Sequence, residues 1–265
     1  MSDARPIGIF DSGVGGLTVV GEIRKILPRE DMIYFGDTAR VPYGTKSKET
    51  VTRFSVENVE FLMKHNVKLV VVACNTASSL SLDFLKRCFR VPVIGVIEPG
   101  AKGAVSSTRR GRIGVIGTQA TISSGAYERE IRKLRADVTV FGQSCPMFVP
   151  LVEEGWLDKK VTADIASVYL APLKKKRVDT LVLGCTHYPL LKKVIGKAMG
   201  KDVLLIDSAR EVAAGVKDLL DASGLLNDTG KGRNSRFFVS DEPGRFIRMG
   251  ERFLHQKIEC AKRAE

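Results

Sequence analysis

Two hydrophobic patterns alternate along the chain. One is a short, uninterrupted apolar run, such as LVVVA at 69–73, and the other repeats apolar residues every three or four positions, as in Leu17, Val20, Ile23 and Leu27. An uninterrupted run is typical of a strand that is buried on both faces, whereas the spaced pattern is typical of a helix with one buried face. The alternation therefore predicts an α/β fold with largely parallel sheets flanked by helices.

The uninterrupted runs form two sets. They predict strands at 7–10, 32–35, 69–73 and 93–96, and then at 113–116, 138–141, 181–183 and 203–206. Each set opens on a strand that runs into a polar turn, GIFDSG in the first set and GVIGTQ in the second. This repetition predicts two pseudo-symmetric domains, with a break at 98–103 where Pro and Gly interrupt the pattern. We expect the first domain to comprise residues 1–97 and 208–265, and the second to comprise residues 98–207.

Small clusters of polar residues follow the predicted strands at their carboxyl ends. They are Asp11 with Ser12, Gly36 with Asp37, Cys74 with Asn75 and Thr76, Thr118, Cys185 with Thr186 and His187, and Asp207 with Ser208. Ligands of parallel α/β sheets bind beyond the carboxyl ends of the strands. If the two domains face each other, these clusters meet, and we therefore predict an active site in the cleft between the domains.

The first cluster continues into a glycine-rich turn, FDSGVGGLT. Its glycines lack the spacing of the dinucleotide-binding fingerprint, and no GK[ST] follows to make a P-loop. A tight strand-to-helix turn would explain the glycines but not the adjacent Asp11 and Ser12. We therefore expect a small-anion site at the helix N-terminus that follows.

Five cysteines are present, and no two of them form a CxxC pair. This argues against a disulfide framework and against a four-cysteine zinc site, so we expect no metal. Three of the five are expected in the core, but Cys74 and Cys185 each end a predicted strand just before a predicted helix, at 78–87 and from Pro189 onward. A helix N-terminus would lower the pKa of each thiol toward neutrality. Such a pair suits a redox couple, a nucleophile with a helper, or two acid/base groups.

Composition and charge narrow the class of protein. Hydrophobic residues make up 44% and charged residues 27%, which is ordinary for a globular protein, and no window approaches the ~18 apolar residues of a membrane helix. The N-terminus lacks the organisation of a signal peptide, so we expect a cytoplasmic protein. The net charge is +12, with basic runs at 109–112, 128–135 and 174–177. Because no aromatic residues are interleaved, these runs favour a solvated surface over a nucleic-acid site.

Seven motifs along the chain resemble those of glutamate racemases, in the aspartate/glutamate racemase family. They are GIFDSGVGGLTVV, YFGDTARVPYGTKS, VVACNTAS, VIEPGAKGA, SSGAYE, FVPLVEEG and LVLGCTHYPLL, and the resemblance extends from residue 7 to about residue 210. His187 in CTHYP is similar to the glutamate branch, because the aspartate branch usually has an acidic residue there. The resemblance implies cofactor-independent interconversion of L- and D-glutamate, a supply of D-glutamate for peptidoglycan, and a homodimer.

The resemblance also implies roles for individual residues. Cys74, as a thiolate, would take the α-proton of D-glutamate while the Cys185 thiol gives a proton to the opposite face, and the reverse reaction would begin at Cys185. Asp11 would assist Cys74, and His187 with Glu153 would assist Cys185, whereas Asp37 matches the family without a defined role. The implied substrate contacts are Asp11, Ser12, Tyr43, Gly44, Asn75, Thr76, Thr118, Thr121, Thr186 and His187.

Three alternatives stay open at the level of the sequence. The same scaffold could serve aspartate or another amino acid, depending on the size of the pocket. The charge of +12 leaves room for a secondary interaction with DNA or with DNA gyrase, which some glutamate racemases are thought to have. Thiol redox chemistry is the third alternative, and it requires a disulfide between Cys74 and Cys185.

Overall fold

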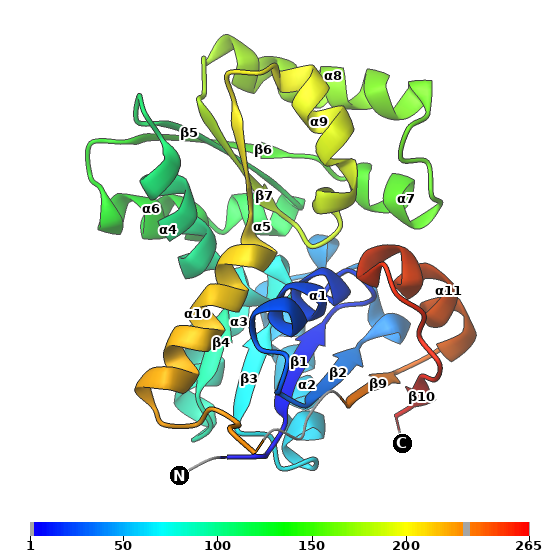
Figure 1. Cartoon of the computed structure of the whole chain (residues 1–265). Helices are drawn as coiled ribbons and strands as arrows, with labels where there is room; N and C mark the ends of the chain where they lie inside the picture. Colours follow the sequence, from blue (N-terminus) through cyan, green and yellow to red (C-terminus); the bar gives the residue numbers. More distant parts are fainter. Residues whose placement is uncertain (1–2, 230–233, 265) are drawn as a thin grey trace.

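The computed structural model describes residues 3–229 and 234–264 and contains two β-sheets (Figure 1). The larger sheet contains β1 (Ile7–Asp11), β2 (Met32–Gly36), β3 (Leu69–Val72), β4 (Val93–Gly95), β9 (Ser235–Val239) and β10 (Lys262–Arg263). The smaller sheet contains β5 (Arg112–Gly117), β6 (Thr139–Ser144), β7 (Thr180–Gly184) and β8 (Leu204–Asp207). All pairings between these strands are parallel. The prediction of parallel sheets and the eight predicted strands are confirmed.

The two sheets share one strand order. The larger sheet contains the series β2-β1-β3-β4, and the smaller sheet has the corresponding series β6-β5-β7-β8. The predicted pseudo-symmetry is therefore confirmed. The larger sheet also extends beyond β2 through β9 and β10, which the sequence did not predict. β9 is only partly buried and β10 consists of two exposed residues, so neither has the uninterrupted apolar run of a central strand.

Helices cover both sheets. They are α1 (Leu17–Ile26), α2 (Lys48–Met63), α3 (Asn75–Cys88), α4 (Ile97–Ser107), α5 (Gln119–Ser123), α6 (Ala126–Leu134), α7 (Phe148–Glu153), α8 (Lys160–Lys175), α9 (Lys192–Met199), α10 (Ser208–Ala222) and α11 (Pro243–Leu254). Short 3₁₀ turns occur at Thr38–Arg40, Tyr43–Thr45 and Tyr188–Leu191. Among the described residues, we find no helix with the length and apolar character needed to cross a membrane.

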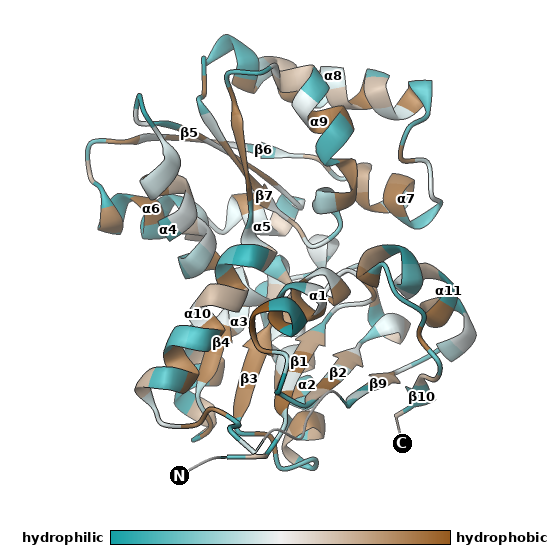
Figure 2. Ribbon diagram, in the orientation of Figure 1, coloured by the Kyte–Doolittle hydropathy of each residue, from teal (hydrophilic) through white to brown (hydrophobic). Residues whose placement is uncertain are grey.

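Apolar side chains pack on both faces of the larger sheet. On one face, Ile9 of β1 lies in a core with Leu17 of α1, and this core continues into the smaller sheet. On the other face, Phe10 lies in a separate core with Val51 of α2 and Leu85 of α3. Alternate residues of β1 and of β3 thus enter different cores, which explains why the apolar run of each strand is uninterrupted (Figure 2).

The chain passes between the two sheets twice. It enters the smaller sheet through α4 and returns from β8 into α10 (Figure 1). The predicted break at 98–103 is wrong in its local structure, because these residues lie inside α4. Pro99 occupies the first turn of the helix, where a backbone N–H is not needed as a donor within the helix. The domain limits at 97/98 and 207/208 stay a prediction.

Candidate active site

A pocket of about 420 Å³ lies between the carboxyl ends of the two sheets. Its lining includes Ser12, Tyr43, Gly44, Cys74, Asn75, Thr76, Thr118, Glu153, Cys185, Thr186 and His187. Two further predicted site residues contact this wall from behind, since Asp11 interacts with Thr186 and Thr121 with Thr76. The structure therefore brings together the catalytic and substrate-contact residues that the resemblance implied, from both repeated halves, whereas Asp37, Asp207 and Ser208 do not line the pocket.

Cys74 is the N-cap residue of α3, which begins directly after it at Asn75 and not at residue 78 as predicted. The Cys74 sulfur accepts a hydrogen bond from the N–H of Ala77 at 3.5 Å and lies 3.5 Å from the Ser12 hydroxyl. Burial and the nearby Asp11 carboxylate nevertheless raise the pKa of Cys74 to about 12. The expected lowering of this pKa is thus wrong, because desolvation outweighs the helix N-terminus.

Asp11 explains the glycine-rich turn. Its carboxylate is fully buried and accepts hydrogen bonds from the N–H groups of Gly13 and Gly16. Burial raises the pKa of Asp11, although the His187 charge and these N–H groups oppose the rise. The small anion expected at this turn is therefore a carboxylate of the chain itself. Gly15 allows the turn to approach the other half of the molecule, since a Cβ there would lie 2.3 Å from the Thr186 hydroxyl.

A relay of side chains leads away from Cys185. Its sulfur lies 3.9 Å from Nδ1 of His187, and Nε2 of His187 lies 3.3 Å from Oε1 of Glu153. Burial alone would lower the pKa of His187, but its interactions with Cys185 and Glu153 outweigh burial and raise this pKa to about 10. Burial likewise opposes ionisation of Glu153, but His187 and Arg245 keep the pKa of Glu153 below its ordinary value. The Cys185 side thus holds an imidazolium at neutral pH.

The segment after Cys185 differs from the predicted α-helix. It forms a 3₁₀ turn at Tyr188–Leu191, and α9 begins only at Lys192. In an α-helix, residue 189 would donate to the carbonyl of Cys185, but Pro189 has no N–H. The N–H of Tyr188 makes this bond instead, at 3.1 Å. Cys185 therefore lies beside His187 and not at a helix N-terminus.

Neutral donors gather on the opposite wall of the pocket. The hydroxyls of Thr76, Thr118 and Thr121 lie within 3.0 to 3.3 Å of one another. Asn75 is buried, and its Nδ2 has no hydrogen-bond partner among the residues that the structure describes. A buried donor without a partner is costly, and Asn75 is one of the residues that line the pocket, so this amide is a candidate donor for a ligand acceptor.

Asp37 supports this wall without lining the pocket. Its carboxylate accepts hydrogen bonds from the Tyr43 hydroxyl, from Arg40 at 2.6 Å and from Ser240 at 3.0 Å. Asn58 also donates to the Tyr43 hydroxyl, at 3.1 Å. The sequence left the role of Asp37 undefined, and the structure makes it an anchor for the loop that carries Tyr43.

Three residues near the site were missed at the level of the sequence. Arg245 of α11 lies 3.6 Å from Oε2 of Glu153, and the Phe253 ring of the same helix packs edge-on against the His187 ring. Tyr127 donates a hydrogen bond to Oδ1 of Asn75 at 2.7 Å. Tyr127 had a signal in the SSGAYE motif, whereas an arginine and a phenylalanine in an amphipathic helix are typical of an ordinary surface helix.

The other three cysteines were all predicted to lie in the core, and the prediction is right for one of them and wrong for two. Cys145 is buried as expected, and its carbonyl accepts the hydroxyl of Tyr188 at 2.8 Å. Cys88 and Cys260 are exposed, so their assignment to the core is wrong. Cys88 ends α3 and Cys260 follows α11 in irregular structure, where no second layer covers them. All five cysteines are free thiols.

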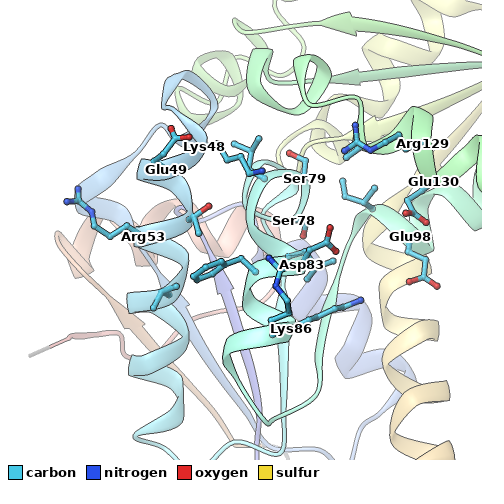
Figure 3. Close-up of a pocket in the computed structure, with 18 of the residues that line it drawn as sticks. Lys48, Glu49, Arg53, Ser78, Ser79, Asp83, Lys86, Glu98, Arg129 and Glu130 are labelled. Carbon is cyan, nitrogen blue, oxygen red and sulfur yellow. The ribbon is translucent and has the colours of Figure 1, made fainter.

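A larger hollow, of about 1030 Å³, lies on another side of α3 (Figure 3). It is bordered by α2, α3 and α6, and it carries charges of both signs, among them Lys48, Glu49, Asp83, Lys86 and Arg129. Its walls are exposed helix faces and not strand ends. We therefore assign the chemistry to the smaller pocket, where the buried thiols and the unpartnered amide lie.

Known proteins share both the sequence and the fold. A family model described as Asp/Glu/Hydantoin racemase matches residues 14–216. The glutamate racemase of Geobacter metallireducens is 57% identical over 96% of this chain and 94% of its own length. The structure of a Bacillus anthracis glutamate racemase has a TM-score of 0.95 at 42% identity, covering 98% of this chain and 97% of that one. The Francisella tularensis glutamate racemase, solved with D-glutamate, has a TM-score of 0.93 at 40% identity, covering 99% and 98%.

The family model covers most of the chain, and the three relatives match over nearly the full length of both partners. The family model defines the class of the protein, and the glutamate racemases define the branch within that class. The chain belongs to the Asp/Glu/Hydantoin racemase family and, within that family, to the glutamate racemases.

Proposed function

We propose that this protein interconverts L- and D-glutamate, with Cys74 and Cys185 as the two groups that exchange protons with the α-carbon. The observation that carries the proposal is that two buried thiols, at corresponding strand ends of two repeated sheets, line one pocket. The substrate is inferred from the relatives named glutamate racemase and from the neighbour solved with D-glutamate.

The reaction needs one proton acceptor and one proton donor on opposite faces of the α-carbon. From D-glutamate, the Cys74 thiolate takes the α-proton and becomes a thiol, and the carbon retains the electron pair of the broken C–H bond. The Cys185 thiol then gives its proton to the opposite face and becomes a thiolate. Nothing is oxidised or reduced, and the product is L-glutamate. In each direction one sulfur begins without a proton and the other with one, and the two have exchanged these states when the product forms.

The surroundings of the two sulfurs suggest which of them is the acid and which is the base for L-glutamate. The pKa of Cys74 is raised to about 12, so its thiol keeps its proton at neutral pH. His187, with its pKa raised to about 10, places a positive charge beside Cys185, where it would stabilise a thiolate. We infer that in the reaction of L-glutamate Cys74 acts as the acid and Cys185, beside the His187 charge, acts as the base.

The neutral donors would bind the substrate and the charge that develops on it. The free Nδ2 of Asn75 and the hydroxyls of Thr76, Thr118 and Thr186 can donate to carboxylate oxygens. As the α-proton leaves, negative charge spreads onto the α-carboxylate, and donors that are already held in place stabilise this charge without reorganising.

The proposal is tested by following the circular dichroism of L-glutamate and, separately, of L-aspartate with purified protein. We expect the signal of glutamate to decay to zero, with solvent deuterium entering the α-position. Cys74→Ser and Cys185→Ser should each lose roughly 10³-fold in rate, because a serine hydroxyl is a far weaker acid than a thiol. Cys88→Ser, at an exposed cysteine, is the matched control and should keep full activity. Turnover of aspartate alone, or full activity in either active-site variant, contradicts the proposal.

Three further features follow from family membership. We propose that the D-glutamate is used in peptidoglycan synthesis, that the protein works in the cytoplasm, and that it forms a homodimer. Rescue of a bacterium that depends on external D-glutamate tests the first point, and failure of an active protein to rescue growth would contradict it. Fractionation of cells tests the second, and analytical ultracentrifugation tests the third.

A further inference from the structure

The SSGAYE motif has no part in the proton transfers, yet its tyrosine is buried beside the pocket. Tyr127 lies in the first turn of α6 and is only 3% exposed. Its hydroxyl donates to Oδ1 of Asn75 at 2.7 Å, across the boundary between the two repeated halves. It also forms a hydrogen bond with Ser208, the first residue of α10.

This hydrogen-bond chain has a definite direction. The Tyr127 hydroxyl has a single proton and gives it to Oδ1 of Asn75, so in its contact with Ser208 the Tyr127 oxygen can only accept. An asparagine amide has one acceptor end and one donor end, and turning it over exchanges them. With Oδ1 held by Tyr127, the donor end remains for the pocket, and this Nδ2 is the buried atom without a partner in the described part of the chain.

Two glycines shape the slot that holds the Tyr127 ring. A Cβ on Gly100 of α4 would lie 3.2 Å from the Tyr127 hydroxyl, and a Cβ on Gly184 at the end of β7 would lie 3.1 Å from the other edge of the ring. Gly100 lies where the chain enters the smaller sheet, and Ser208 lies where it returns. Tyr127 is therefore wedged at the two crossings between the sheets, with its hydroxyl aimed at a residue of the pocket wall.

We propose that Tyr127 is a positioning residue for substrate binding, which holds the Asn75 amide with its NH₂ group free for a carboxylate of the substrate. A carboxylate offers only acceptor atoms, so an amide turned the other way would face it with an oxygen and repel it. The three motifs that contain Gly100, Tyr127 and Gly184 would thereby all serve to hold the Tyr127 hydroxyl against the Asn75 amide. This inference rests on the proposed function, because the carboxylate is that of glutamate.

The test is a double-mutant cycle with glutamate as substrate. Tyr127→Phe keeps the ring and removes only the hydroxyl, and we expect KM for both enantiomers to rise roughly tenfold while kcat changes by less than about twofold. Asn75→Ala should raise KM by at least as much. In the Asn75→Ala background, adding Tyr127→Phe should change KM by less than about twofold, since the amide that Tyr127 orients is gone.

Two controls keep the result interpretable. Tyr169→Phe removes another hydrogen-bonded tyrosine hydroxyl, which accepts from the N–H of Met147, and KM should stay unchanged. Thermal unfolding shows whether Tyr127→Phe is folded. Effects of Tyr127→Phe and Asn75→Ala that multiply in the double variant would overturn the inference, as would an unchanged KM in Tyr127→Phe. If the wild-type protein fails to racemise glutamate, it is the proposed function that fails.

Discussion

At the scale of single residues, two thiols of similar burial have opposite surroundings. Cys74 is 5% exposed and lies near the Asp11 carboxylate, whereas Cys185 is 6% exposed and lies beside His187. A carboxylate favours the protonated thiol and an imidazolium favours the thiolate. The difference between the two sides of the site therefore comes from the neighbours of each sulfur and not from its access to solvent.

The charge on His187 gives a prediction about stability. Its pKa is 6.5 in an ordinary environment and about 10 in the folded protein, so the folded state binds the proton more tightly. This contribution to stability is fully present below pH 6.5 and is lost as the pH rises through about 10. We expect the difference in unfolding free energy between the wild type and His187→Gln to shrink over this range. Urea unfolding at pH 6, 8 and 10 measures it, and a difference that grows with pH would contradict the assignment.

At the scale of elements, α11 connects the edge of the larger sheet to the Cys185 side of the pocket. Arg245 reaches Glu153, Phe253 packs on His187, and a Cβ at Gly155 would lie 2.6 Å from the Arg252 guanidinium. One helix thus contacts the relay and the turn that follows α7. These contacts involve one side of the active site only.

Removing the Arg245 side chain should therefore have a one-sided effect. The ion pair is partly exposed, with Arg245 at 58%, so we expect Arg245→Ala to lower the rate only about two- to fivefold. In the proposed reaction Cys185 removes the proton of L-glutamate, so the primary isotope effect with α-deuterated L-glutamate should rise relative to that with D-glutamate. Arg248→Ala, at an exposed arginine one turn further along α11, is the control. Equal changes in both directions would argue against the relay.

The elements also show what a sequence can and cannot predict. The run at 69–72 is apolar because both faces of β3 are covered, so every residue of the strand is buried and hydrophobic. Cys74 and Cys185 could be found because each follows such a run. Arg245 could not, because its role depends on how α11 docks against α7, a contact between residues far apart in the chain. The pKa of Cys74 was wrongly predicted for a similar reason, since the burial of its sulfur, and secondly its closeness to Asp11, arise only when β1 pairs with β3 and the two halves pack together.

At the scale of the whole molecule, the buried ion pair between Lys68 and Glu30 connects segments that are far apart in the chain. Lys68 contacts Glu30 at 2.6 Å and donates to the carbonyls of Asp3 and Leu225. Both charged side chains are almost fully buried. The N-terminal segment, the entry to β2, the entry to β3 and the connection after α10 thus meet at one ammonium group, at the end of the larger sheet away from the pocket.

Breaking this pair should destabilise the protein without changing its chemistry. Lys68→Met leaves the Glu30 carboxylate buried and uncompensated, and we expect a loss of about 3–5 kcal/mol in unfolding free energy. Lys68→Met combined with Glu30→Leu should recover part of the loss, and Lys64→Met, at an exposed lysine nearby, should cost little. Denaturant unfolding measures these differences, while KM should stay unchanged in the variants that fold. A double variant less stable than Lys68→Met would refute the account.

The cluster of three threonine hydroxyls bears on how one pocket can treat mirror images alike. Each O–H bond of Thr76, Thr118 and Thr121 can rotate, and in each of their contacts either oxygen can be the donor. A rigid set of donors would itself be chiral in its demands and would hold one hand of the substrate better than the other. When these hydroxyls rotate, the direction in which each one donates changes without any movement of the backbone. In the proposed reaction, the similar binding of both enantiomers would then depend on three hydroxyl groups that exchange donor and acceptor roles when the α-carbon changes configuration.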